Sequence, residues 1–156
     1  METTMSEGTA TRQTGRLPSW LKGFNRVIMA LQRLGLVVGS MHVLSVPGRR
    51  SGVFRSTPVS LLTVDDQRYI VAGLENADWV LNARAAGRGV LRRGRMEEHV
   101  SLVELPVEDR GPILREFPRQ IPQGVPFFTQ LYGVSADPEE FAGLANTCPV
   151  FRVERR

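Results

Sequence analysis

The stretch VPGRRSGVFRSTPV, Val46 to Val59, joins two apolar, strand-like runs of the chain. It carries more charge and flexibility than a hairpin turn needs, in three arginines, two glycines and three hydroxyl side chains: Arg49, Arg50, Arg55, Gly48, Gly52, Ser51, Ser56 and Thr57. Arginine forks bind anions in bidentate geometry, glycines expose backbone N–H groups to a ligand, and Pro58 fixes where the next strand begins. The loop is therefore predicted to hold an anionic ligand, and a solvated basic turn is the alternative.

The runs on either side of this loop predict strands over residues 42–46 and 56–64. A tight turn over residues 65–67 leads to a further strand over 68–74, which completes a hairpin. Two strands are predicted within 89–106 and one over 148–156, helices over 77–87, 107–117 and 137–146, and an aromatic, Pro-rich connection over 118–133. Because the strands are joined by turns too short for parallel crossovers, the pattern indicates an α+β chain around a mainly antiparallel sheet, closed or half-closed as a small barrel.

Two further segments are predicted before the folded domain, at the N-terminal end of the chain. Residues 1–16 are polar and predict a disordered tail. Residues 17–36 carry apolar residues at helical spacing and predict an amphipathic helix, which either packs on the core or rests its cationic face on a membrane surface. A length of 156 residues with 42% hydrophobic residues suits one folded domain, placed at residues 40–156.

Composition narrows the functional classes. The single Cys148 excludes an intramolecular disulfide, indicates a reducing cytoplasm and is expected to be buried. No apolar run is long enough to span a bilayer, so the chain is not expected to be transmembrane. We expect it in the cytoplasm or peripherally at the inner face of the cell membrane. His42 and His99 lie in predicted strands without further suitably spaced ligands, so no metal site is expected. The net charge of +4 suits an anionic partner, but the basic run over residues 84–95 lacks interleaved aromatic residues, which disfavours nucleic acid.

Three segments together resemble a known family. LSVPGRRSGVFRSTPVSLL (44–62), RYIVAG (68–73) and DWVLNARAAGRGVLRRGR (78–95) are similar to the nitroreductase family of deazaflavin-dependent oxidoreductases from actinobacteria. The resemblance extends from about residue 17 to residue 156 in the order of elements. It implies a split β-barrel of six or seven mainly antiparallel strands with flanking helices, and coenzyme F420, rather than flavin mononucleotide, as the cofactor.

The resemblance also implies a binding site. The loop residues Arg49, Arg50, Ser51, Gly52, Arg55, Ser56, Thr57 and Pro58 would hold the phospholactyl group of F420 and its neighbours. Ala72, Gly73 and Leu74 would lie along the deazaflavin ring, and Trp79, Val80 and Asn82 would close the site from the following helix. The implied reaction is hydride transfer from reduced F420 to a quinone, an enone or a nitro compound, for which the protein mainly positions two planar systems.

Several alternatives stay open. Tyr132 is a candidate proton donor to the reduced acceptor, or an aromatic side chain packed in the core. The segment LENADW (74–79) is shorter than the corresponding loop of better-known family members and carries Glu75 and Asp78, whose charge disfavours an anionic coenzyme. The second functional hypothesis is therefore a protein of the same fold that binds a fatty acid or another lipophilic ligand. In that case Arg49, Arg50 and Arg55 would bind the carboxylate head group of the ligand. Exposed strand edges make a homodimer a further expectation.

Overall fold

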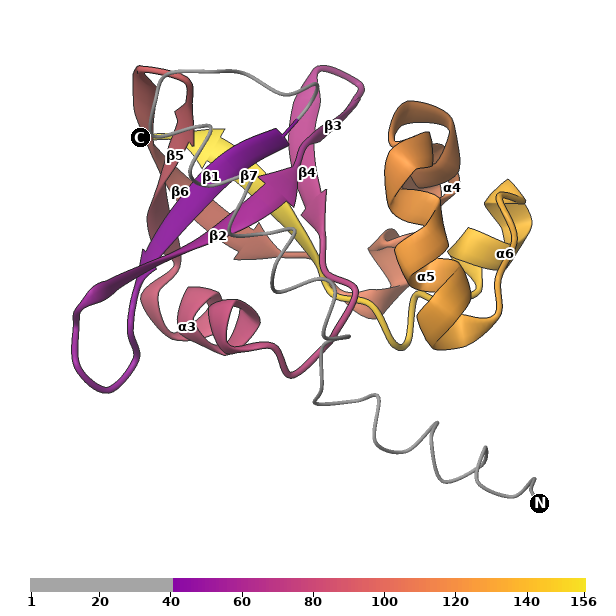
Figure 1. Cartoon of the computed structure of the whole chain (residues 1–156), viewed down its shortest axis with the longest axis horizontal. Coiled ribbons are helices and arrows are strands. Elements are labelled where there is room, and N and C mark those ends of the chain that lie inside the picture. The colour runs from indigo at the N-terminus through magenta and orange to yellow at the C-terminus, as the bar shows by residue number, and fades with distance from the viewer. Residues whose placement is uncertain (1–40) are drawn as a thin grey trace.

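The computed structural model describes residues 41–156 (Figure 1). The predicted tail over residues 1–16 and the predicted helix over residues 17–36 lie outside the described residues. The described strands are β1 Met41–Pro47, β2 Phe54–Ser60, β3 Leu62–Val64, β4 Gln67–Val71, β5 Arg88–Arg93, β6 Met96–Glu104 and β7 Val150–Arg155. The described helices are α3 Asp78–Ala86, α4 Gly111–Gln120, α5 Val125–Tyr132 and α6 Pro138–Ala142, with short 3-10 turns η2 Val107–Asp109 and η3 Pro122–Gly124.

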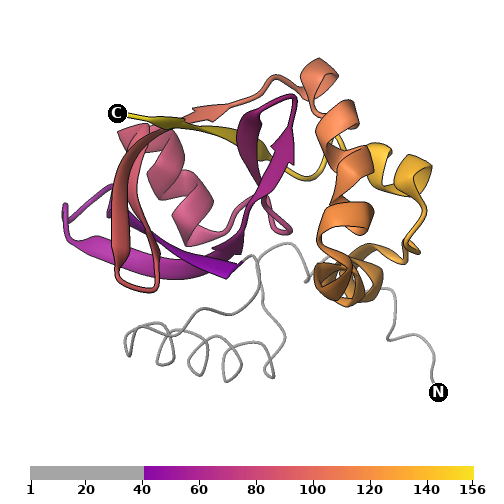
Figure 2. The same cartoon turned by 90° about the horizontal axis from the view of Figure 1, so that it is seen from above.

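The seven described strands form one antiparallel sheet in the order β2-β1-β5-β6-β7-β4-β3. β2 and β3 stand at opposite edges of this sheet, yet Leu61 alone separates them along the chain. A sheet whose edges are joined by one residue must curl until those edges meet, and Figure 2 shows the resulting ring of strands from above. The predicted α+β split barrel is thereby confirmed, with seven strands and flanking helices.

The interior of the barrel is filled by apolar side chains that alternate along the strands, and α3 covers one end of it. Val80 and Ala83 of α3 are fully buried against these strands. Alternation follows from the strand period of two, which sends every second side chain inward. The buried members of this core are Leu44, Val46, Val59, Ile70, Ala72, Val80, Ala83, Leu91, Val100, Leu102, Phe151 and Val153.

A layer of helices, α4, α5 and α6, packs beside the barrel (right of Figure 1). Its centre is a cluster of aromatic rings, in which Phe117 stacks on Phe141 at 5.4 Å between ring centroids and meets Phe128 edge-on at 4.9 Å. Leu62 of β3 and Val150 of β7 belong to the same apolar cluster. These two strand residues therefore join the helical layer to the barrel through buried apolar contact.

Hydrogen bonds also join the helical layer to the barrel. The Gln120 side chain pairs with the edge strand β3, because Oε1 accepts from the Thr63 N–H at 3.0 Å and Nε2 donates to the Thr63 carbonyl at 2.8 Å. Arg110, 8% exposed, donates to the Leu105 and Ala145 carbonyls, each at 3.0 Å. It also donates to Glu104 at 3.2 Å, and Glu104 accepts two bonds of 2.7 and 2.8 Å from Arg84 of α3. Buried polar groups near the boundary thus have partners.

The structure departs from the predicted elements in two stretches. The predicted strand over 56–64 breaks at Leu61, because β2 pairs with β1 on one edge of the sheet and β3 pairs with β4 on the other. The predicted connection over 118–133 is largely helical: α4 continues to Gln120 and α5 follows, with Pro126 in its first turn, where a proline leaves no helical hydrogen bond unmade. Among the described residues, no helix is long and apolar enough to cross a bilayer.

Candidate functional site

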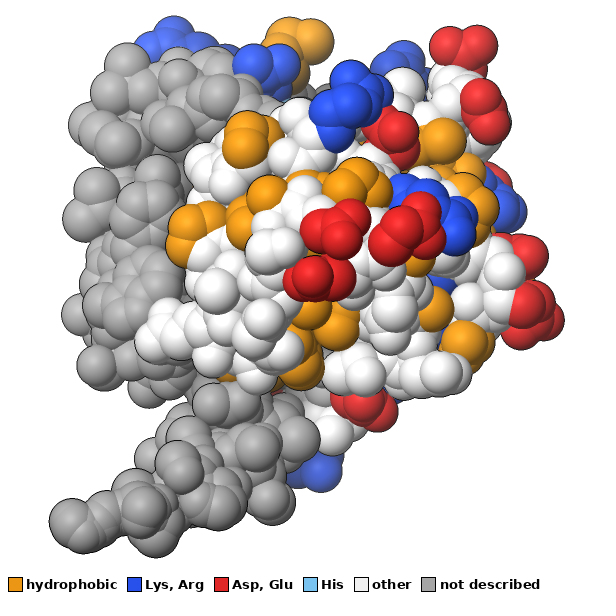
Figure 3. Space-filling model, turned by 90° about the vertical axis from the view of Figure 1, so that its right-hand side faces the viewer, with side chains coloured by type: hydrophobic (Ala, Val, Ile, Leu, Met, Phe, Trp, Pro, Cys, Tyr) orange, Lys and Arg blue, Asp and Glu red, His pale blue; other side chains and the backbone are white. Residues whose placement is uncertain are grey.

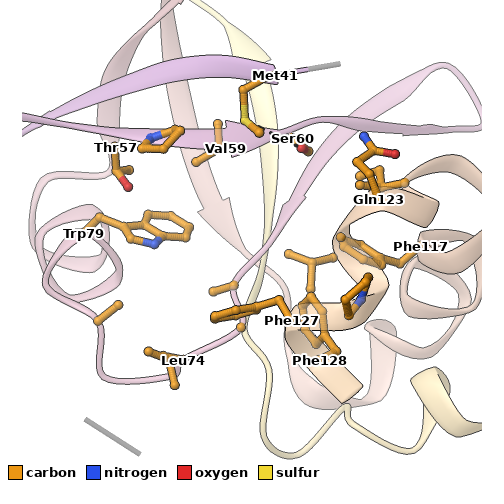
Figure 4. A pocket seen from close by; sticks show the side chains of 18 residues that line it. Met41, Thr57, Val59, Ser60, Leu74, Trp79, Phe117, Gln123, Phe127 and Phe128 are labelled. Carbon is orange, nitrogen blue, oxygen red and sulfur yellow. Dashed lines mark hydrogen bonds between the residues drawn. The ribbon is translucent and has the colours of Figure 1, made fainter. Parts of the chain in front are cut away.

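A groove with two adjoining halves lies where the barrel is split, between β2, the end of β4 and α3. One half is a mostly apolar cavity of about 350 Å³, drawn in Figure 4, and the other is a more polar cavity of about 360 Å³. Thr57, Leu74, Ala77 and Trp79 line both halves. The shared residues make the two cavities parts of one continuous site.

The polar half collects hydrogen-bonding side chains from three elements. Besides the shared residues it is lined by Arg55, Ser56, Asn76, Asp78 and Asn82. Ser56 is held in place from β1, since its hydroxyl lies 2.7 Å from the hydroxyl of Ser45. Arg55 supplies the cationic guanidinium of this half, a group suited to phosphate or carboxylate oxygens. Asp78 lies at the same wall, so the half is of mixed charge.

Arg49 ties the loop between β1 and β2 to α3. Its backbone N–H and its Nη1 donate to Asn82 Oδ1 at 3.0 and 2.8 Å, and its Nη2 lies 3.5 Å from Asp78 Oδ1. Asn82 is only 3% exposed. Two donors on one atom identify that atom as the amide oxygen, so the Asn82 amide nitrogen is the group left to donate toward a bound molecule. Arg49 therefore positions Asn82.

Other loop residues lie outside the groove. Arg50, Ser51 and Gly52 are exposed and line neither half. The loop also uses its own backbone donors, since the Gly48 N–H bonds the Val53 carbonyl at 2.8 Å and the Gly52 N–H bonds the Gly48 carbonyl at 2.9 Å. The expectation that these two N–H groups face a ligand is wrong, because they close the turn, in which Gly52 adopts a φ of 76°.

The apolar half is bounded by the barrel on one side and by the helical layer on the other. Figure 4 shows Trp79 of α3 at one end and the rings of Phe117, Phe127 and Phe128 at the other. Among the described residues that line it, none is charged, and the polar side chains are those of Thr57, Ser60 and Gln123. The remaining lining residues are Met41, Pro58, Val59, Val71, Ala72, Gly73, Leu74, Ala77, Ile121, Gly124 and Pro126. Such a cavity suits an uncharged, planar or apolar molecule.

Gly73 is the point at which the helical layer touches the end of β4. A Cβ atom at this position would lie 2.2 Å from Cε2 of Phe127, far inside van der Waals contact, so only glycine accommodates that ring. The Tyr132 hydroxyl donates to the Gly73 carbonyl at 2.5 Å. Both contacts come from α5 and place its aromatic side chains against the wall of the apolar half.

Tyr132, which is half-buried, and Cys148, which is fully buried, interact behind this wall. Burial is the main cause that raises the pKa of Tyr132, and the neighbouring Cys148 is the second. Burial also raises the pKa of Cys148, to about 12. Cys148 is fully buried, as expected, and remains a thiol at neutral pH. Tyr132 does not line the groove, and its proton is engaged by the Gly73 carbonyl.

The structure brings most of the expected site residues together. Arg55, Ser56, Thr57, Pro58, Ala72, Gly73, Leu74, Trp79 and Asn82 line the groove. Val80, the residue after Trp79 in α3, lies in the barrel core, is 0% exposed and does not line the groove. Phe117, Ile121 and Gln123 were missed; the aromatic, Pro-rich composition of residues 117–128 was the only signal for them. Within residues 41–156, no cluster of His, Cys, Asp and Glu could hold a metal ion.

Solved structures place this geometry in a fold class. A structure described as a domain-swapped dimer is 18% identical, with a TM-score of 0.54 over 87% of this chain and 98% of the other. A structure of an F420-H2 dependent reductase, FDR-A, is 18% identical, with a TM-score of 0.54 over 76% and 98%. A protein of unknown function from Agrobacterium tumefaciens is 12% identical, with a TM-score of 0.53 over 83% and 56%. The fold is the split barrel of flavin- and deazaflavin-binding proteins.

The family follows from the sequence match. Residues 28–125 match the model of the F420H(2)-dependent quinone reductase family, so the chain belongs to that family. Its cofactor is coenzyme F420, and the chain is an F420-dependent oxidoreductase. No curated protein matches the sequence.

Proposed function

We propose that the chain transfers a hydride from reduced F420 to an uncharged planar acceptor, such as a quinone, an enone or a nitro compound. The observation that carries this proposal is the division of one groove into a polar half and an apolar half that meet at Trp79. F420 itself combines an anionic tail, which suits the polar half, with a planar ring, which suits the apolar half. When bound in reduced form, the coenzyme supplies the hydride.

The proposed roles of the residues follow from their places in the groove. Arg55, Ser56, Thr57 and the amide nitrogen of Asn82 bind phosphate oxygens in the polar half, while Arg49 holds Asn82 in orientation. Ala72, Gly73, Leu74 and Trp79 flank the planar ring, and the phenylalanines of the helical layer exclude water from the acceptor. Arg50, Ser51 and Gly52 support the loop from outside the groove, and Val80 packs α3 onto the barrel.

For Tyr132 we propose a positioning role in place of proton donation. Its hydroxyl already donates to the Gly73 carbonyl, and its raised pKa makes the phenol a weaker acid. By holding Gly73, Tyr132 sets the distance between the ring-flanking residues and α5.

The test is a fluorescence titration of the full chain with oxidised F420, beside flavin mononucleotide and a fluorescent fatty acid. We expect saturable F420 binding that weakens by about tenfold or more in Arg55→Ala, because a charge-assisted bidentate contact is lost. Arg95→Ala, which removes an exposed arginine outside the groove, is the matched control and should bind as the parent chain does. Oxidation of reduced F420 by menadione, by cyclohexenone and by a nitroaromatic compound would then rank the acceptors.

Two results would contradict the proposal. F420 affinity that is equal in Arg55→Ala and the parent chain would remove the polar half as the coenzyme site. Saturable fatty-acid binding without turnover of any acceptor would favour the second hypothesis, in which the uncharged lining of the apolar half holds an acyl chain and Arg55 holds its carboxylate.

We also propose that the chain forms a homodimer. β2 and β3 are the outer strands of the sheet, and the Gln120 side chain already occupies the hydrogen-bonding groups of Thr63 on β3. Light scattering after size-exclusion chromatography gives the mass directly, and a monomer at all concentrations would refute the proposal.

A further inference from the structure

The hairpin tip, residues 48–55, comprises the turn after β1 and the first two residues of β2, and it exposes adjacent apolar side chains. Among the described residues, the large apolar side chains left exposed are Val53 at 60%, Phe54 at 47%, Met96 at 76% and Val107 at 38%. Two of these four are neighbours in the sequence, Val53 at the end of the turn and Phe54 at the start of β2. Figures 1 and 2 both show this hairpin extending away from the body of the barrel. Adjacent apolar side chains on a projecting turn mark a contact surface.

The surroundings of these apolar residues are cationic. Arg49, Arg50 and Arg55 belong to the tip, and the Arg88 guanidinium lies 5.9 Å from the centre of the Phe54 ring. The tip itself contains no carboxylate. Apolar side chains flanked by arginines match the two layers of an anionic lipid surface, since the arginines meet the phosphates and the apolar groups reach the acyl boundary.

The opposite end of the molecule carries the other sign of charge. Residues 105–146, which form the helical layer, contain six carboxylates and three arginines. Figure 3 faces this side and shows Asp and Glu side chains grouped over it. Figures 1 and 2 agree that the helical layer and the hairpin tip lie at opposite ends. A charge distribution of this kind turns the hairpin tip toward an anionic surface and the helical layer away from it.

We propose that the hairpin tip docks on an anionic lipid surface, with Val53 and Phe54 in the headgroup region and the guanidinium groups of Arg50 and Arg88 on lipid phosphates. β2 runs from this tip directly into the wall of the groove, through Arg55 to Ser60. Docking therefore places the groove beside the lipid, where apolar molecules concentrate. The contact does not involve the predicted helix over residues 17–36, and it does not depend on which acceptor is reduced.

The test is flotation of the full chain with phosphatidylcholine vesicles and with mixed phosphatidylcholine–phosphatidylglycerol vesicles at low and high salt. We expect binding to the anionic vesicles only, weakened by salt. The double variant Val53→Asp/Phe54→Asp should lower the partition coefficient by about tenfold or more, because it removes the apolar contact and adds repulsion. The matched control Met96→Asp/Val107→Asp makes the same change of charge at the other two exposed apolar positions and should stay within about twofold of the parent chain.

An F420 titration of each variant shows that the groove is folded, since Val53 and Phe54 line neither half. Three results would overturn the proposal: no vesicle binding by the parent chain, equal loss in the two double variants, or parent-like binding by Val53→Asp/Phe54→Asp. Conversion of a dimer to a monomer by Val53→Asp/Phe54→Asp, with no vesicle binding by the parent chain, would also overturn it and would assign the tip to an interface between copies of the chain.

Discussion

Gly73, at the end of β4, is the residue at which the strand wall of the groove contacts the helical wall. The Phe127 ring packs on its backbone and Tyr132 binds its carbonyl, so two side chains of α5 converge on one residue at the end of β4. The sequence resemblance pointed to Gly73 as a neighbour of the ring, but it gave no sign of these partners. They come from a helix that lies 50 or more residues further along the chain, and single-residue patterns do not encode such contacts.

Gly73→Ala should disturb the groove through Phe127. The added Cβ would stand 2.2 Å from the ring, so the ring must move. We expect F420 binding to weaken by about tenfold in Gly73→Ala, and the same substitution to have a much smaller effect in a Phe127→Ala background. Fluorescence titration of the four chains of this double-mutant cycle measures the coupling. Equal effects of Gly73→Ala in both backgrounds would contradict the proposed contact.

Tyr132→Phe separates positioning from proton donation. Loss of the hydrogen bond to Gly73 should lower the free energy of unfolding by about 1 kcal/mol. The pH profile of kcat should keep its shape, because the phenol does not face the acceptor. Denaturant unfolding and the pH dependence of turnover are the two measurements. A large fall in kcat with unchanged stability would instead identify Tyr132 as the proton donor.

At the scale of elements, the sequence predicted those segments whose pattern is local. The turn at Asp65 and Asp66, where both residues adopt positive φ, was visible as a short polar break between alternating runs. The helix over 77–87 was bounded by Ala77 and Gly87, and α3 has these residues as its caps. By contrast, α5 was missed because prolines and consecutive aromatic residues conceal the helical period in a segment of eight residues.

Glu104 links three elements, and its ionisation should show in stability. Hydrogen bonds from Arg84 foremost hold the pKa of Glu104 below its usual range. A lowered folded-state pKa contributes stability that is complete above the unfolded pKa and is lost as the pH falls through the folded pKa. We expect the free energy of unfolding to fall between about pH 5 and pH 3, and to fall less steeply in Glu104→Gln.

The measurement is urea unfolding across this pH range. Glu108→Gln is the matched control, because it removes an exposed carboxylate from η2. It should keep the slope of the parent chain. A slope for Glu104→Gln equal to that of the parent chain would show that the contacts with Arg84 and Arg110 add no stability.

At the scale of the whole molecule, coenzyme binding should stabilise the barrel and the helical layer together, since both line the groove. At a free F420 concentration of about one hundred times Kd, linkage gives about 2.7 kcal/mol. We therefore expect Tm to rise by several degrees in a single transition. Differential scanning calorimetry with and without F420 measures this rise, and Arg55→Ala should reduce it. Two separate transitions, with only one shifted, would contradict a shared site.

The closure of the sheet at Leu61 was beyond sequence prediction, because it depends on which distant strands become edges. Its consequence is that the site lies at a seam between β2 and the end of β4, which no hydrogen bond between strands of residues 41–156 crosses. Side chains on either side of that seam can therefore be substituted without loss of a backbone hydrogen bond between strands. Descendants of such a chain can therefore diverge in the molecules they reduce while inheriting an unaltered scaffold.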